Sequence, residues 1–180
     1  MAKLLSQKFY DQMAKLEPRY PNKVALLLPA LHAAQDETSW LPPEIMEEIG
    51  AYIGIHPAQV REVASFYTMY NLKPVGKYHL RVCTNVACCL RGSDEIVEHV
   101  EKKLGIVVGQ TTPDKMFTLM EEECLGACGT APAMMLNNDY VENMTIQSVD
   151  QLLDKLRAEM AAGRSPAVPG QGFRGEGVQS

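Results

Sequence analysis

The sequence predicts an α+β protein: a small helical bundle over residues 1–74, then a domain of alternating strands and helices over residues 75–162. Two observations predict this. Apolar residues recur at helical spacing through the first seventy or so positions, and after Lys73–Gly76 the pattern changes to residue-by-residue alternation. From Gly163 onward, five glycines and two prolines accompany scattered apolar residues, which predicts a flexible tail over residues 163–180.

Four short amphipathic helices account for the first part of the chain. Pro18 stops the first helix, and Asn22 is placed to cap the second. Pro42–Glu44 suit the first turn of the third helix, Gly54 ends it, and the fourth starts near Pro57. Their predicted buried stripes are Leu5, Phe9, Met13 and Leu16; Leu26, Leu27, Leu31 and Ala34; Ile45, Ile49, Tyr52 and Ile53; and Val60, Val63, Ala64 and Tyr67.

The second part opens with a strand and a helix. Apolar and polar residues alternate over Tyr78–Val82, which predicts a strand with one buried face. Ser93 is placed to cap the following helix, and Gly105 ends it. Phe117–Met120 predicts a second strand. Helix and strand therefore alternate, as in a layered α/β or α+β structure.

A hairpin and a final helix complete this part. The hairpin pairs residues 133–136 with residues 140–142 around Asn137–Asp139, which tolerate left-handed backbone angles. Ser148 and Gln151 are predicted to form a capping box for the last helix. The predicted core stripe of that helix consists of Val149, Leu152, Leu153, Leu156 and Met160.

Composition excludes several classes of function. The chain has 17 basic and 22 acidic residues, a net charge of -5, and no cluster of Lys and Arg, so we expect no nucleic-acid partner. The longest apolar run, around Val24 to Leu28, is broken by Pro29 and is too short to span a bilayer. The first residues have no apolar signal core. These features predict a soluble, cytoplasmic protein without membrane insertion.

Four of the five cysteines fall into two closely spaced pairs. The pairs are Cys83-x4-Cys88 and Cys124-x3-Cys128, separated by 35 residues. Cytosolic thiols stay reduced, so metal or cluster binding is favoured over disulfides. Each pair follows a predicted strand, and loops at the same end of adjacent strands bring four sulfurs together. The residues thus predict a four-thiolate site.

The spacing leaves two kinds of site open, an iron–sulfur cluster and a zinc ion. A [2Fe–2S] centre with four thiolates is negatively charged, and its burial requires backbone N–H groups directed at sulfur. Gly126 and Gly129, beside Cys128, allow such backbone angles. A Rieske centre needs two histidine ligands and a thioredoxin-type redox site needs Cys-x2-Cys, so neither is expected.

The remaining chemistry-bearing residues have structural interpretations. Cys89 could compete with Cys88 for iron but is interpreted as a free, buried thiol. Glu121–Glu123 could form a docking surface but are interpreted as a solvated strand end. The histidines are interpreted as surface or helix-end residues: His32, His56, His79 and His99. The following are interpreted as core: Phe66, Tyr67, Tyr70, Met134 and Met135. No glycine-rich nucleotide motif is present, so this chain is not expected to bind flavin or nucleotide itself.

Three segments resemble a known family over roughly residues 3 to 160. They are ALLLPALHAAQDETSWLPPE, VREVASFYTMYNLKPVGKYHLRVCTNVACCLRGS and EEECLGACGTAPAMMLN. These are similar to the thioredoxin-like ferredoxin subunits of NADH:quinone oxidoreductase, the E or 24-kDa-type subunits of respiratory complex I. The cysteine loops are the most specific part of the resemblance. Similar sequences serve as small diaphorase subunits of NAD-linked hydrogenases and formate dehydrogenases.

The resemblance implies a thioredoxin-like α/β domain with a mixed sheet, preceded by the helical bundle. It implies that Cys83, Cys88, Cys124 and Cys128 hold one [2Fe–2S] cluster. In the family an Ala-Pro pair recurs after the second cysteine loop, and here it is Ala131-Pro132. It further implies a hetero-oligomer at the inner face of the bacterial plasma membrane, in which a partner subunit binds FMN and NADH. Catalysis belongs to that assembly, and this chain contributes no substrate chemistry; a stand-alone thioredoxin-like ferredoxin is an alternative.

Overall fold

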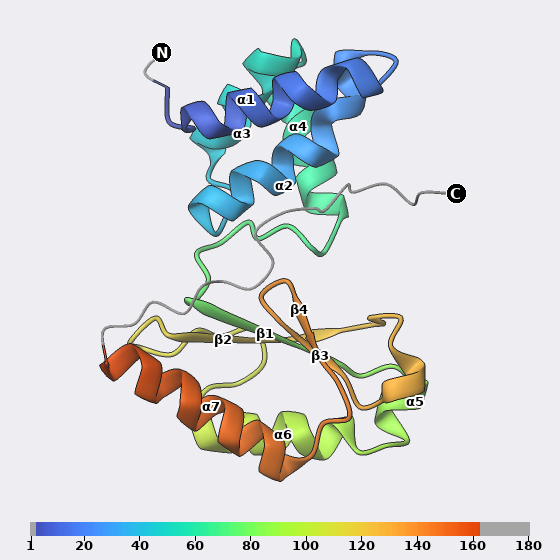
Figure 1. The fold of residues 1–180 in the computed structure, drawn as a ribbon, viewed down its shortest axis with the longest axis vertical. Coiled ribbons are helices and arrows are strands. Elements are labelled where there is room, and N and C mark those ends of the chain that lie inside the picture. The colour runs from blue at the N-terminus through green and yellow to red at the C-terminus, as the bar shows by residue number, and fades with distance from the viewer. Residues whose placement is uncertain (1–2, 163–180) are drawn as a thin grey trace. The chain divides into compact units, whose positions relative to one another are not determined.

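The chain divides into two compact units between Val75 and Gly76 (Figure 1). A computed structural model describes residues 3–162, and each unit has its own hydrophobic core. The predicted tail over residues 163–180 lies outside the described residues.

Four helices make up the first unit, as predicted. They are α1 (Gln7–Leu16), α2 (Leu27–Thr38), α3 (Pro43–Ile53) and α4 (Pro57–Phe66), with 3₁₀ turns at Glu17–Arg19 and Lys23–Leu26. Most residues of the predicted apolar stripes form the core, with Phe9, Met13, Leu31, Ile49 and Val60 almost completely buried. Burial of these stripes is the main stabilising interaction of such short helices.

In the first unit, the predicted helix ends are confirmed with one adjustment. Asn22 Oδ1 accepts a hydrogen bond from the Ala25 amide at 3.2 Å, but the turn that it caps is the 3₁₀ turn, and α2 starts only at Leu27. Gly54 ends α3 with a φ of 86°, a left-handed angle that glycine adopts without steric cost.

The prediction that Phe66 and Tyr67 lie in the core is wrong. Phe66 is 76% exposed and Tyr67 is 39% exposed. Tyr67 has an extended backbone conformation, so α4 ends at Phe66. The buried stripe of the helix therefore does not continue to Tyr67. Tyr70 is buried as expected, and its hydroxyl donates a hydrogen bond to the Leu28 carbonyl at 3.1 Å.

A four-stranded mixed sheet forms the second unit, which confirms the predicted fold class. The strands are β1 (Tyr78–Cys83), β2 (Phe117–Glu122), β3 (Met134–Leu136) and β4 (Asp139–Val141), in the order β2-β1-β3-β4. Strands β1 and β2 are parallel, whereas β1–β3 and β3–β4 are antiparallel. The helices are α5 (Val86–Cys89), α6 (Ser93–Leu104) and α7 (Ile146–Ala161), with a 3₁₀ turn at Cys128–Thr130.

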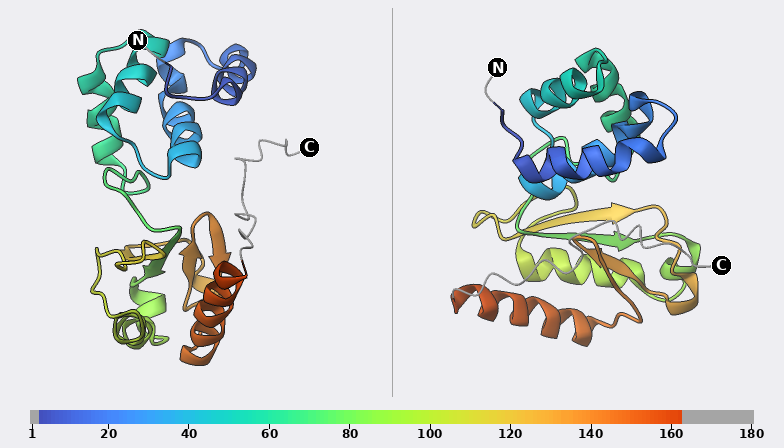
Figure 2. Two further views of the ribbon diagram at one scale, coloured as in Figure 1. Left: turned by 90° about the vertical axis from the view of Figure 1, so that its left-hand side faces the viewer. Right: turned by 45° about the horizontal axis from the view of Figure 1, so that its top comes forward.

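Helices α6 and α7 lie along the same face of the sheet (Figures 1 and 2). Leu80 and Val82 of β1 pack into the core shared with these helices, together with Phe117, Leu119 and Leu153. Since side chains alternate along a strand, the odd-numbered residues of β1 lie on the opposite face. His79 is among them and is half-buried in the central strand, so its interpretation as a surface residue is wrong.

The chain before β1 closes tightly onto β2. A Cβ atom on Gly76 would lie 2.8 Å from the Phe117 carbonyl carbon, so no other residue fits there without a backbone shift. The Gly76 amide also donates a hydrogen bond to the buried hydroxyl of Thr118 at 2.6 Å. This contact fixes the start of the parallel pairing.

The outer edge of β2 is occupied by the segment that precedes it. The Gly109 amide donates a hydrogen bond to the Leu119 carbonyl at 2.8 Å, and the Leu119 amide donates one to the Gln110 carbonyl at 3.1 Å. The Thr112 amide donates to the Phe117 carbonyl at 2.8 Å. These backbone groups of the edge strand are therefore satisfied within the chain.

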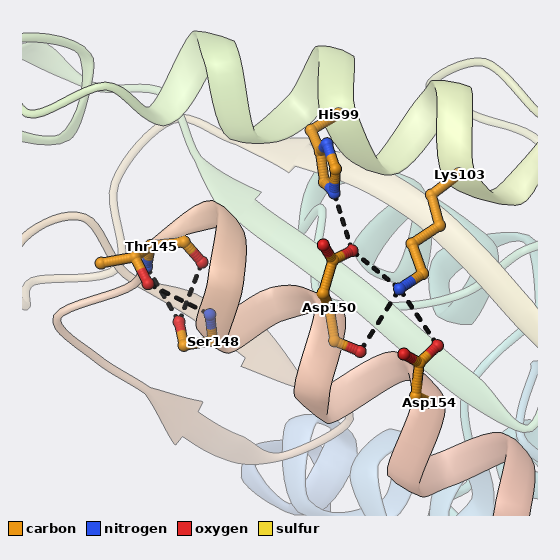
Figure 3. A network of polar contacts seen from close by, with 6 residues as sticks. All are labelled: His99, Lys103, Thr145, Ser148, Asp150 and Asp154. Carbon is orange, nitrogen blue, oxygen red and sulfur yellow. Dashed lines mark hydrogen bonds and ion pairs between the residues drawn. The ribbon is translucent and has the colours of Figure 1, made fainter.

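Two predicted helix caps are wrong by one and three residues. Gly92, with a φ of 89°, is the N-cap of α6, and Ser93 is its first, buried residue. Helix α7 begins at Ile146, and its capping box joins Thr145 to Ser148 (Figure 3). In both cases a residue just upstream has the non-helical conformation that a cap requires. Met160 of α7 is partly exposed and is not a core residue.

An ion-pair network joins α6 to α7 (Figure 3). Asp150 Oδ1 lies 2.8 Å from His99 Nε2 and 2.7 Å from Lys103 Nζ, and Lys103 also lies 3.0 Å from Asp154. Lys103 first, and then His99, hold the pKa of Asp150 below its usual range. The network thus fastens the two helices on their solvent side.

No helix within residues 3–162 combines the length and the apolar character needed to cross a membrane.

We expect Asp150→Asn to lower the melting temperature at pH 7 by a few degrees, since Lys103 and His99 lose their carboxylate. The pKa of Asp150 is lowered in the folded state, so its contribution is present above the unfolded value of about 3.9 and disappears as the pH falls through the folded value. Calorimetry of wild type and variant over this pH range checks that the difference between their melting temperatures disappears at low pH. Asp154→Asn, which removes a more exposed partner of Lys103, should have a smaller effect; equal losses would contradict this account.

Candidate functional site

The first cysteine loop brings Cys83 and Cys88 together. Cys83 ends β1 and is buried, with its amide donating to the Ala133 carbonyl at 3.0 Å. Asn85 Oδ1 accepts a hydrogen bond from the Val86 amide at 2.9 Å and starts α5, whose single turn returns Cys88 to the buried side. The sequence analysis did not predict this short helix.

The pKa of the Cys88 thiol reflects this position. Burial raises the pKa, a backbone hydrogen bond with Ala133 opposes the shift, and contacts with Cys83 and Cys128 raise it further. A backbone amide that stabilises a thiolate is the kind of interaction that a negatively charged sulfur site needs.

The second cysteine loop follows β2. Gly126 adopts a φ of 73°, and this left-handed turn directs its amide at the Cys124 sulfur, 3.4 Å away. The predicted role of Gly126 is therefore confirmed, whereas no left-handed angle occurs at Gly129. Cys128 opens the 3₁₀ turn, and the Ala131-Pro132 peptide bond that follows is cis.

Strand β4 and the segment after it hold this second loop in place. The Tyr140 hydroxyl donates to the Leu125 carbonyl at 2.8 Å, and the Thr130 hydroxyl donates to Glu142 at 2.5 Å. The Asn143 amide donates to the Thr130 carbonyl at 2.7 Å. Tyr140 therefore has a positioning role that the sequence analysis missed, because nothing in its local pattern indicates a partner fifteen residues away.

The four predicted ligands form a buried pair and an exposed pair. Cys83 and Cys88 are buried together with Ala131, while Cys124 and Cys128 are exposed. Leu125, next to Cys124, packs against the buried pair. Within residues 3–162, no three His, Cys, Asp or Glu side chains are grouped so that they could hold a metal ion. The ligand set stays a prediction.

The surroundings of these thiols fit an iron–sulfur cluster. The donors are all sulfur, and backbone amides are directed at two of the four, from Ala133 to Cys88 and from Gly126 to Cys124. Small apolar side chains, Ala87 and Ala131, line the buried pair. Two pairs of thiolates occur both at [2Fe–2S] centres and at zinc sites, so the pairing by itself does not separate the two.

Cys89 points away from the other thiols. Its S–H group donates to Asp94 Oδ2 at 3.3 Å, and this hydrogen bond raises the pKa of the thiol. The side chain is exposed, so the prediction that Cys89 is buried is wrong. The cause is α5: adjacent residues of a helix face different directions, and Cys88 takes the buried side.

Glu122 also differs from its sequence interpretation. Its carboxylate lies 3.6 Å from Arg81 Nη1, and the side chain is 16% exposed rather than solvated. The alternation of β1 and the parallel register place Arg81, Cys83 and Glu122 on one face of the sheet. This alternation is readable from the sequence, but the register is not.

Comparison with known proteins identifies clear relatives. The family model of thioredoxin-like [2Fe-2S] ferredoxins matches residues 13–157. The second E-type subunit of the NADH-quinone oxidoreductase of Rhizobium meliloti is 42% identical over 164 residues, covering 89% of this chain and 98% of the relative. The E-type subunit of the same enzyme from Rickettsia conorii is 46% identical over 142 residues, 77% of this chain and 85% of the relative.

A solved structure shares most of the fold. A chain of an NAD+-reducing [NiFe]-hydrogenase, in its air-oxidized state, superposes with a TM-score of 0.68 at 25% identity. The match covers 78% of this chain but only 24% of the hydrogenase chain.

In protein prepared without iron, we expect three classes of thiol. Cys124 and Cys128 should react rapidly with an alkylating reagent, and Cys89 more slowly because Asp94 raises its pKa. Cys83 and Cys88 should react slowest, because they are buried. Mass spectrometry of peptides after timed labelling measures the rates, with urea-unfolded protein as the control. Labelling of Cys88 as fast as Cys124 would contradict the geometry.

Proposed function

The chain belongs to the thioredoxin-like [2Fe-2S] ferredoxin family, and we propose that it is an electron-transfer subunit of an NADH:quinone oxidoreductase. In this proposal Cys83, Cys88, Cys124 and Cys128 hold one [2Fe–2S] cluster, which exchanges single electrons with the FMN of an NADH-binding partner subunit. The chain itself binds neither FMN nor NADH and performs no bond-making chemistry.

One observation carries the proposal: both cysteine loops follow the carboxyl ends of adjacent parallel strands. Cys83 lies opposite Glu122 in the β1–β2 register, and Cys124 comes two residues after Glu122. Parallel strands run in the same direction, so both loops leave the sheet at one edge. The two loops that carry the four cysteines therefore begin at the same edge of the sheet, which supports the proposed ligand set.

The residues around the loops supply what the bound group needs. A [2Fe–2S] cluster supplies one-electron transfer, in which only its charge changes and no bond of a substrate is made or broken. Ala131 and Leu125 exclude water from the buried thiol pair. The backbone groups of Gly126 and Ala133 offer hydrogen bonds to sulfur, which stabilise negative charge there.

The relatives support the proposed assembly. Subunits named as part of NADH-quinone oxidoreductase match this chain along most of their length. In such an assembly the chain would bind peripherally at the inner face of the plasma membrane. The hydrogenase likeness favours a second candidate, the small diaphorase subunit of an NAD-linked hydrogenase, with the same cluster and a similar flavin-bearing partner.

Anaerobically purified chain should be coloured, contain two irons, and give an electron paramagnetic resonance signal after reduction with dithionite. Changing Cys83, Cys88, Cys124 or Cys128 to Ala should abolish the native visible absorption. Cys89→Ala is the matched control and should keep it, because Cys89 points toward Asp94. A colourless protein with one zinc, or loss of colour in the Cys89 variant alone, would refute the ligand assignment.

A tagged copy, expressed in its native cell, should co-purify with a flavoprotein that oxidises NADH. Mass spectrometry of the purified assembly distinguishes the two candidates, because quinone-reductase subunits or hydrogenase subunits would accompany the chain. Recovery of the chain as a monomer that still carries its cluster would favour a stand-alone ferredoxin instead.

A further inference from the structure

An unusually buried ion pair lies on the face of the sheet opposite α6 and α7 (Figure 1). Arg81 Nη1 is 3.6 Å from Glu122 Oε1, and the two side chains are only 12% and 16% exposed. By contrast, the Lys102–Glu98 pair on α6 is 77% and 68% exposed. Burial of charged groups is costly, and a pair of this kind is weak evidence for stability.

Its position is next to the first predicted ligand. Glu122 is the residue directly across from Cys83 in the parallel register, and neighbouring strands lie about 4.8 Å apart. Arg81 precedes Cys83 by two residues, so both side chains leave β1 on the same face. The Thr84 amide donates to the Glu122 carbonyl at 3.0 Å and fixes this register as the chain leaves the sheet.

Further contacts fix the guanidinium of Arg81. Nη2 donates to the Asn137 carbonyl at 2.8 Å and contacts Met135 Sδ at 3.4 Å. Asn137 is itself fixed, since its side-chain oxygen accepts a hydrogen bond from the His79 amide at 2.8 Å. Arg81 Nε is buried and has no hydrogen-bond partner among the described residues.

His79, a further titratable group of β1, lies on the same face. Burial first, and then the charge of Arg81, lower its pKa to about 4, so His79 is neutral at physiological pH. The fixed charges beside Cys83 on β1 and β2 are therefore the cation of Arg81 and the anion of Glu122.

We propose that the Arg81–Glu122 pair sets the reduction potential of the cluster, an inference that rests on the proposed function. Reduction adds one negative charge to the cysteine-bound centre. A buried cation nearby favours the reduced form, a buried carboxylate opposes it, and neither is screened as a surface charge is. In wild type, the positive charge of Arg81 offsets the negative charge of Glu122 beside Cys83.

The test compares Arg81→Gln, Glu122→Gln, the double variant and wild type, each with its cluster. Iron content, absorption and paramagnetic resonance first establish that the cluster is present, and a redox titration then gives the midpoint potential. A wild-type chain without a [2Fe–2S] cluster would refute the proposed function, whereas clusters with unchanged potentials would refute only this inference.

We expect opposite shifts in the single variants. Arg81→Gln leaves Glu122 uncompensated and should lower the potential, whereas Glu122→Gln should raise it. We expect about a tenfold change in the ratio of oxidised to reduced protein at a given potential, equivalent to about 59 mV for a one-electron couple. The double variant should return toward wild type, and Lys102→Gln, which removes a remote exposed cation, should leave the potential unchanged.

A purely structural role predicts a different pattern. If loss of the pair merely loosened the cysteine loop, both single variants would shift in the same direction, and this result would overturn the inference. Should Arg81→Gln fail to assemble its cluster, Glu122→Gln decides alone: a raised potential supports the inference and an unchanged one overturns it.

Discussion

The parallel pairing of β1 with β2 is the constraint on which the rest of the second unit depends. Parallel strands require a long crossover, provided here by α6, and they release the chain at the same edge of the sheet. Gly76 and Thr118 fix the register at one end, and Thr84 and Glu122 fix it at the other. A slip of one residue would turn Cys83 to the opposite face and separate it from Cys88.

Most of the secondary structure could be predicted from the sequence, because the apolar spacing changes so clearly near Gly76. The caps were less predictable: Gly92 and Thr145 replace Ser93 and Ser148, since several neighbouring residues have capping chemistry and only the tertiary fold selects one. Tyr67 was misassigned because an apolar pattern does not reveal the residue at which a helix stops.

The candidate site was predicted in part. Cysteine spacing identified the loops, and the likeness to a known family supplied the cluster type. What the spacing does not contain is the environment: α5 turns Cys88 inward and Cys89 outward, and the partners of Tyr140 and Glu122 lie far away in sequence. Such contacts depend on strand order and register, which single-residue patterns do not encode.

The segment that pairs with the outside of β2 has a further consequence. A strand at the border of a sheet ordinarily offers unpaired amides and carbonyls to any extended peptide, which leads to aggregation or to recognition by strand addition. Here Gly109, Gln110 and Thr112 already use those groups. Along Phe117 and Leu119, another polypeptide therefore finds these backbone groups already paired, and a binding protein must recognise the shape and side chains there instead.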